Sequence, residues 1–280
     1  MDSAKATRTY WAFILIPLAV LATFYFYPLF KVLWLSVTEP TPGFANYEKL
    51  VSSEAIQRIL LTTLRICVVT TAIALVIGYA IAYAMLQVPP RRRVWMLFIV
   101  LLSFWLSVLV RGFAWLTLLQ SHGLINSALM ALGLIDAPLP LVRNEFGVII
   151  GMVHYLIPYA VLPIYANMQG IDPRLVPAAR GMGATRFGAF WRIFLPLSKP
   201  GIISAGILLF VFSLGFYVTP ALLGGGKTVM IAEYISVQIL DALNWGTGSM
   251  LATTLLLAVV AILAVVSRFA NLRQAFGAKA

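Results

Sequence analysis

The stretch Asp172–Pro196, DPRLVPAARGMGATRFGAFWRIFLP, is a polar interruption between two long apolar segments. It opens with Asp172 and Pro173, a pair typical of a helix start, because aspartate accepts from free backbone N–H groups and proline presets φ. Gly183 lies where a helix end needs a positive φ, and a second helical run starts at Thr185. We predict two short helices joined by a glycine turn, which are either a docking element for another protein or an ordinary solvated basic loop.

The composition of the chain is that of an integral membrane protein. Of its 280 residues, 61% are hydrophobic and 10% are charged, whereas soluble domains are about half apolar and about a quarter charged. The net charge of +11 lies mostly in short links between apolar segments. It therefore indicates membrane topology rather than binding of nucleic acid, for which the chain carries no motif.

Six segments of the chain are apolar enough to cross a bilayer, which takes about 20 residues of helix. The expected spans are 10–37, 60–86, 94–119, 146–168, 200–223 and 250–269, all within a single transmembrane domain of residues 1–280. We read the first span as a retained signal anchor, and the shorter apolar run before the fourth span as an amphipathic surface helix. The prediction is an all-α membrane protein with six transmembrane helices and the loop 172–196 between spans four and five.

Lysine and arginine are distributed unequally between the two sides of this topology. One side holds the N-terminal bases, the run Arg91–Arg93, the four arginines of 172–196 and the basic C-terminus. The links on the other side hold single bases accompanied by acidic residues. Because cytoplasmic links are enriched in Lys and Arg, we expect both termini and the loop 172–196 in the cytoplasm.

Three ionisable side chains, Arg65, Arg111 and His154, fall inside expected spans. An arginine near the centre of a bilayer costs about 2.5–3.5 kcal/mol on insertion scales, so such residues are candidates for a solute path. The alternatives are pairing with a backbone carbonyl or another subunit, or extension toward the outer interface. Tyr155 and Tyr159 lie beside His154 on a proline-interrupted segment, and they either line a passage or pack as ordinary core residues.

Several other functions are excluded. No span has an acidic residue near its middle, which argues against a carrier driven by protons or sodium. The segment Gly224–Thr228 (GGGKT) has Ala221 where a phosphate-binding loop requires its first glycine. His122 and His154 are far apart and Cys67 is the lone cysteine, so neither metal-ligand spacing nor a disulfide is present. We predict no catalytic residue, metal or cofactor site in this chain.

The spacing within 172–196 resembles the cytoplasmic signature of importer-type ABC permeases, Glu-Ala-Ala, three residues, Gly, nine residues, then Ile-x-Leu-Pro. The resemblance implies that this segment is a coupling element seated in a groove of an ATPase subunit. The implied contact residues are Pro177, Ala178, Ala179, Arg180, Gly183, Ala184, Ile193, Leu195 and Pro196. Pro177 stands where the family has Glu, so we expect the coupling helix to start at Pro177 and any salt bridge of that Glu to be absent.

Longer stretches resemble the spermidine/putrescine branch of these permeases, namely Leu109–Leu139, His154–Pro173 and Tyr217–Lys227. Related permeases often carry an Asp near Phe216 and Tyr217, where this chain has aromatic residues. Those aromatics can offer cation–π contact to a polycation, or a partner permease can supply the acid. The candidate path residues are thus Arg65, Arg111, His154, Tyr155, Tyr159, Phe216 and Tyr217.

The resemblance implies a multi-pass permease subunit in the inner membrane of a bacterial cell, which is not itself an enzyme. Its partners would be membrane lipid, a second permease chain, a pair of ATPase subunits that bind ATP and magnesium, and a periplasmic solute-binding protein. The expected solute is a polyamine. The alternatives are an importer of another small organic solute, such as an amino-acid derivative, an opine or a sugar-like compound, and a secondary transporter acting alone.

Overall fold

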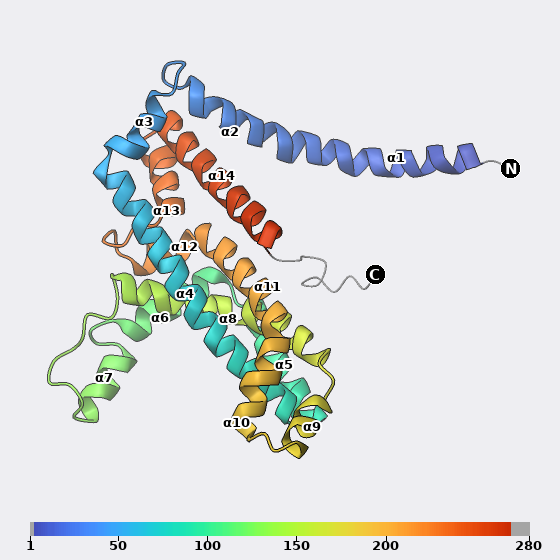
Figure 1. Cartoon of the computed structure of the whole chain (residues 1–280). Helices are drawn as coiled ribbons and strands as arrows, with labels where there is room; N and C mark the ends of the chain where they lie inside the picture. Colours follow the sequence, from blue (N-terminus) through green and yellow to red (C-terminus); the bar gives the residue numbers. More distant parts are fainter. Residues whose placement is uncertain (1–2, 270–280) are drawn as a thin grey trace. The chain divides into compact units, whose positions relative to one another are not determined.

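The computed structural model describes residues 3–269, and all regular elements of this part of the chain are helices (Figure 1). Six helical segments, some of them made of more than one element, are long and apolar enough to cross a membrane: Phe13–Thr38, Glu54–Gln87, Val108–Ala131, Glu145–Gln169, Arg186–Leu214 and Trp245–Arg268. The predicted all-α class with six transmembrane helices is confirmed.

The chain forms two compact units, the first from Met1–Gln57 and Tyr234–Ala258 and the second from Arg58–Glu233 and Val259–Ala280. Elements that lie wholly in the first unit are α1 (Ser3–Leu21), the π-helix η1 (Ala22–Phe26), α2 (Tyr27–Thr38), α3 (Ala45–Ser52) and the π-helix η3 (Val237–Asp241). Three helices belong partly to each unit, α4 (Glu54–Gln87), α13 (Ile231–Ser236) and α14 (Trp245–Phe269). The second unit adds α5 (Pro90–Trp105), α6 (Val108–Leu119), α7 (Leu124–Ala131), α8 (Glu145–Gln169), α9 (Leu175–Gly181), α10 (Arg186–Ala189), the π-helix η2 (Phe190–Phe194), α11 (Leu195–Leu214) and α12 (Val218–Leu223).

Helix α8 is the centre of the second unit, where it contacts α5, α6, α11 and α12. It also contacts α4, because a Cβ built on Gly78 would lie 2.5 Å from the Cβ of Ala160. A Cβ on Gly201 of α11 would likewise lie 2.7 Å from the Cβ of Asn167. Small residues at these crossings let membrane helices approach closely. The core that results is buried and apolar, and includes Ala74, Met85, Leu156, Ala160, Ile164, Met168, Ala205 and Leu209.

The π-helix η2 joins α10 to α11 without a break and ends two residues before Pro196. The N–H of Leu195 donates to the carbonyl of Phe190, five residues back. Proline has no N–H and its ring collides with the carbonyl four residues earlier, so a wider turn accommodates it within a continuous helix. In the first unit, η1 stands in the same register before Pro28.

Two of the expected spans are divided in the structure. The residues expected as span 94–119 form α5 and α6, with extended backbone at Leu106 and Ser107 between them. The residues expected as span 200–223 form most of α11 and the separate helix α12, with Gly215 as the C-cap of α11. At its other end, the fifth apolar segment starts at Arg186 rather than at residue 200, and so begins within the loop 172–196.

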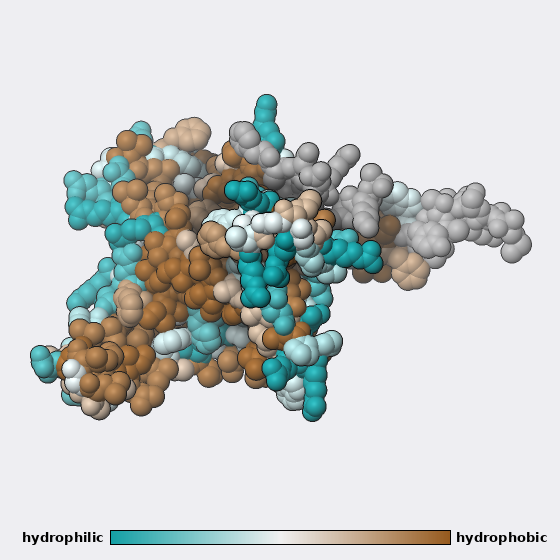
Figure 2. Space-filling model, turned by 60° about the horizontal axis from the view of Figure 1, so that its bottom comes forward, coloured by the Kyte–Doolittle hydropathy of each residue, from teal (hydrophilic) through white to brown (hydrophobic). Residues whose placement is uncertain are grey.

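Large apolar side chains remain on the surface, as expected of helices that contact lipid. Figure 2 shows broad apolar areas on the face that it presents, with the hydrophilic side chains gathered in separate clusters. Within the first unit, the apolar run from Phe13 to Pro28 is exposed throughout its described side chains. Such surface needs a lipid or protein neighbour.

Candidate coupling element and transport path

The coupling element begins with a short turn followed by α9. The Oδ1 atom of Asp172 accepts a hydrogen bond from the N–H of Arg174 at 2.9 Å, which is a local turn rather than a helix cap. Helix α9 then starts at Leu175. The expectation that the helix starts at Pro177 is wrong by two residues, because Pro177 occupies the first turn, where its missing N–H has no intrahelical partner to lose.

Helix α9 ends in a glycine turn at Gly183, whose φ is +93°. The N–H of Gly183 donates to the carbonyl of Arg180 at 3.1 Å, and the N–H of Ala184 donates to the carbonyl of Ala179 at 3.1 Å. This pair of bonds is the Schellman motif, which satisfies the last carbonyls of a helix when the following residue is left-handed. The predicted glycine turn is confirmed.

The second short helix, α10, starts at a capped residue and continues into the membrane helix. The Oγ1 atom of Thr185 accepts from the N–H of Gly188 at 3.0 Å, as an N-cap does. The rings of Phe190 and Phe194 in η2 meet Tyr83 of α4 edge-on, with centroids 5.4 and 5.2 Å apart. The coupling element is therefore packed against α4 and is also continuous with α11 through η2.

The residues of the signature differ in exposure. Ala179 is buried, Ala184, Ile193 and Leu195 are half-buried, and Pro177, Ala178, Arg180, Gly183 and Pro196 are exposed. The exposed members lie mostly on α9 and its turn, where a partner can reach them. The one buried member, Ala179, lies on α9, which packs against α10 and η2.

The second group of interest surrounds Arg111, which is only 6% exposed. Its Nη2 atom donates to the carbonyls of Ser103 and Leu106, where α5 ends. Its guanidinium lies 5.0 Å from the ring centroid of Tyr155, a cation–π distance. Its Nε atom has no partner among the described residues. Arg111 therefore satisfies carbonyls at the break between α5 and α6 and keeps one donor free.

An aromatic cluster extends from Tyr155 along α8. Tyr155 and Tyr159 stack with centroids 5.5 Å apart, and their hydroxyl oxygens are 3.3 Å apart. Phe216, in the segment after α11, meets Tyr155 edge-on at 4.9 Å. The structure thus brings four candidates, Arg111, Tyr155, Tyr159 and Phe216, into one cluster.

Two further members of this cluster, Phe104 and Phe212, are not among the sequence candidates. Their rings lie 4.8 Å and 4.9 Å from that of Tyr159, both edge-on. Phe212 is four residues before Phe216, a spacing that would place both on one side of a continuous helix, but α11 ends at Leu214 between them. Phe104 is brought in only by the packing of α5 on α8, for which no local pattern exists.

The remaining candidates lie outside the cluster's ring contacts. Nδ1 of His154 accepts from Nε1 of Trp115 at 3.0 Å, so this imidazole serves a contact between α8 and α6. Arg65 forms an ion pair with Glu145, with side-chain exposures of 62% and 30%. Such an exposed pair contributes little to stability. Tyr217 is 45% exposed and directly precedes α12 as its N-cap residue.

Glu233 is a buried carboxyl that lies outside the six spans and is not among the sequence candidates. It is 8% exposed, and its Oε2 atom has no partner among the described residues. Burial raises the pKa of this carboxyl, and a hydrogen bond with the backbone of Met230 partly offsets the rise. Burial favours the neutral form because the charged form loses its hydration.

Comparison with known proteins adds to this geometry. Residues 74–272 match the family model described as "Binding-protein-dependent transport system inner membrane component". The chain belongs to this family. The chain is a permease subunit of an ABC importer, and the predicted membership in this family is confirmed.

Curated relatives extend over much of the chain. The spermidine/putrescine transport system permease protein PotB of Escherichia coli K12 is 33% identical over 210 residues, 75% of this chain and 76% of the relative. The PotB protein of Haemophilus influenzae is 37% identical over 181 residues, which cover 65% of this chain and 63% of that relative.

Solved structures share the fold. A chain of a bacterial ABC transporter for import of the acidic polysaccharide alginate matches with a TM-score of 0.78 and 19% identity, covering 95% of this chain and 96% of that chain. A chain of the MetNI methionine ABC transporter matches with a TM-score of 0.54 and 18% identity, covering 81% of this chain and 100% of that one. At these identities the likeness concerns the fold alone.

Proposed function

We propose that this chain forms half of the translocation path of an ATP-driven importer for a polyamine. A second permease chain forms the other half, two ATPase subunits dock on the permease pair, one of them on the segment 172–196 of this chain, and a periplasmic binding protein delivers the solute. Both termini and the coupling element are cytoplasmic in this arrangement, as the bias of Lys and Arg supports.

The observation that carries the coupling role is the geometry of α9 and its turn. A short helix with exposed Ala178 and Arg180 ends in a Schellman turn at Gly183 and continues through η2 into α11. A force applied to α9 by an ATPase is therefore transmitted to a membrane helix without a flexible link. Switching of access then follows as rigid elements move between two arrangements.

In this arrangement ATP and magnesium bind to the ATPase subunits. This chain provides movement and the path, and no step of ATP hydrolysis is assigned to its residues.

The proposal of a polyamine rests on the PotB relatives, which are named for spermidine and putrescine. The aromatic cluster is compatible with that solute, because aromatic faces attract cationic amines. In this role Tyr159 and Phe216 offer ring surface, whereas Arg111 already occupies one face of Tyr155. Arg65 and His154 each have a partner within the chain, so their role in the path is the weaker part of the proposal.

One observation favours a second solute class. The buried guanidinium of Arg111 retains an unpartnered Nε, and a fixed cation attracts a carboxylate and repels an amine. A small organic solute with a carboxylate, such as an amino-acid derivative, is the alternative that this contact favours.

Uptake measurements separate the two solute classes. The complete transporter, with its cognate binding protein, is reconstituted in liposomes loaded with ATP, and uptake of radiolabelled putrescine, spermidine and an amino-acid derivative is compared. The proposal expects saturable uptake of a polyamine that unlabelled polyamines inhibit. Uptake of the carboxylate-bearing solute alone would replace the polyamine assignment by the alternative.

A further inference from the structure

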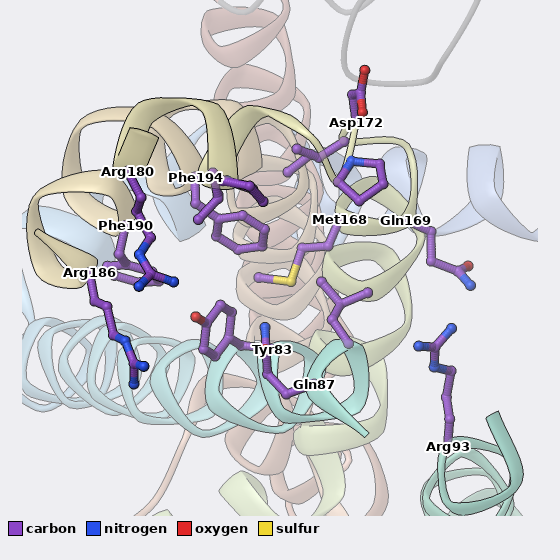
Figure 3. Close-up of a pocket in the computed structure, with 15 residues that line it drawn as sticks. Tyr83, Gln87, Arg93, Met168, Gln169, Asp172, Arg180, Arg186, Phe190 and Phe194 are labelled. Atoms are coloured by element: carbon purple, nitrogen blue, oxygen red, sulfur yellow. The ribbon is translucent and has the colours of Figure 1, made fainter. Parts of the chain in front are cut away.

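A cavity of about 700 Å³ lies between α9, α10 and η2 on one side and the adjoining ends of α4, α5 and α8 on the other (Figure 3). Its walls include three arginines, Arg93, Arg180 and Arg186, but only one acidic residue, Asp172. The candidate path does not use this cavity, since none of the Arg111 cluster lines it.

The three arginines are not neutralised within the described part of the chain. Arg180 and Arg186 are exposed and have no ion pair there, and Figure 3 shows both side chains extending toward Tyr83. Arg93 is held differently: its Nε donates to the carbonyl of Met85 at 3.0 Å. Carbonyls leave the charge of a guanidinium intact, so the cavity is a preformed cationic site.

Asp172 does not cancel this charge. Its Oδ1 accepts from the backbone N–H of Arg174 at 2.9 Å, and Figure 3 shows its carboxylate at the edge of the group, pointing away from Arg180 and Arg186. Two neutral amides, Gln87 and Gln169, also line the cavity, and they can donate hydrogen bonds to an anion.

The rest of the wall is apolar. Leu86, Met168, Val176, Phe190 and Phe194 line the cavity beside the polar residues. A soluble anion would gain nothing from these side chains, whereas a molecule with an anionic head and hydrocarbon chains would satisfy both kinds of wall. Basic pockets between membrane helices on the cytoplasmic side are suited to anionic lipid head groups.

We propose that this cavity binds one anionic phospholipid of the cytoplasmic leaflet, with its phosphate at Arg180 and Arg186, across the cavity from Arg93 (Figure 3), and its acyl chains along the apolar wall. The lipid links α9 and α10 to the ends of α4, α5 and α8 and so supports the coupling element. The inference rests on the proposed function for its placement at the cytoplasmic side.

The residue three positions before Arg180 supports this assignment. It is Pro177, which lines the cavity and carries no charge. A glutamate at this position would lie three residues before Arg180 on α9, a spacing at which opposite charges pair. Proline in its place leaves the charge of Arg180 available to a ligand.

The test counts lipids bound to the purified, delipidated transporter complex by native mass spectrometry during titration with phosphatidylglycerol or phosphatidylcholine. We expect one saturable phosphatidylglycerol for each copy of this chain and no comparable site for phosphatidylcholine. Each basic residue at an anionic membrane surface contributes about 1 kcal/mol, so Arg180→Gln with Arg186→Gln should weaken this binding roughly 30-fold. The matched control, Arg91→Gln with Arg92→Gln, removes two exposed arginines that do not line the cavity and should retain the site.

A second variant keeps the proposal testable if the double variant does not assemble. Pro177→Glu should weaken phosphatidylglycerol binding, because a glutamate there would pair with Arg180. Equal binding of the two lipids, equal loss in the Arg91/Arg92 control, or displacement of the lipid by millimolar inorganic phosphate would overturn the proposal. ATP-driven uptake measured on the same preparation tests the transport function separately, so loss of one result does not imply loss of the other.

Discussion

Gly183 and Gly181 offer a direct test of the geometry of the coupling turn. A Cβ added at either position meets no atom within 4 Å, so neither Gly183→Ala nor Gly181→Ala creates a clash. The two differ in backbone: Gly183 has a φ of +93°, whereas Gly181 is the last residue of α9. A left-handed conformation costs an L-residue about 1–2 kcal/mol, while alanine in place of a helical glycine is favourable by up to about 1 kcal/mol.

The expected result follows from this difference. If the ATPase requires the Schellman turn, Gly183→Ala should weaken association with the ATPase by roughly 5- to 30-fold, since 1.4 kcal/mol is about tenfold. Gly181→Ala should leave association unchanged or slightly stronger. The assay is titration of the detergent-purified permease pair with fluorescent ATPase, with membrane insertion checked by protease protection. Equal affinities of the two variants would refute the argument that this turn determines docking.

Three further predictions concern other contacts. Arg111→Ala should lower the melting temperature, because it leaves the carbonyls of Ser103 and Leu106 without their donor, at a cost of about 1–3 kcal/mol. As a change to a candidate path residue it should also abolish most uptake, and normal uptake with a lowered melting temperature would restrict Arg111 to a structural role. Gly78→Leu should destabilise the contact between α4 and α8 by about 1–3 kcal/mol or more, since even a Cβ there lies 2.5 Å from that of Ala160, and a thermal shift in detergent measures it; an unchanged melting temperature would contradict this contact. The melting temperature of Glu233→Gln should rise relative to that of the wild type as pH rises from 4.5 to 8. Parallel curves of melting temperature against pH for the two proteins would contradict the assignment of a buried carboxyl that lacks a full set of partners.

The sign of the Glu233 prediction follows from proton linkage. Because burial raises the pKa of Glu233, the folded state holds a proton that the unfolded state has released above the ordinary glutamate pKa of about 4.3. Stability then falls as pH rises from that value to the folded-state pKa. Glutamine has no proton to lose, so the variant escapes this decline.

The local features of the coupling element were predictable because they depend on neighbouring residues. A glycine is required at the left-handed position after α9, and Thr185 caps the next helix through its own hydroxyl. The start of α9 was not predictable from Pro177 alone, because proline fits anywhere in a first turn. The π-helical form of η2 likewise depends on how the chain accommodates Pro196.

Long-range contacts account for what the sequence could not reveal about the path. Arg111 and Tyr155 belong to different helices, and only their packing shows that the guanidinium covers one face of the ring. The break at Leu106 and Ser107 contains neither glycine nor proline, so no local signal marks it. The sequence left open whether the intramembrane ionisable residues line a path or pair within the protein. The structure gives partners to all three: backbone carbonyls to Arg111, Trp115 to His154 and Glu145 to Arg65.

The central claim is that this chain moves solute only when an ATPase acts on the segment 172–196. The most direct measurement is solute uptake into liposomes that contain the whole transporter, with either the intact ATPase or one unable to hydrolyse ATP. The account predicts ATP-dependent uptake with the intact ATPase and none with the inactive one. Uptake that persists with the inactive ATPase would contradict the account and indicate a secondary transporter.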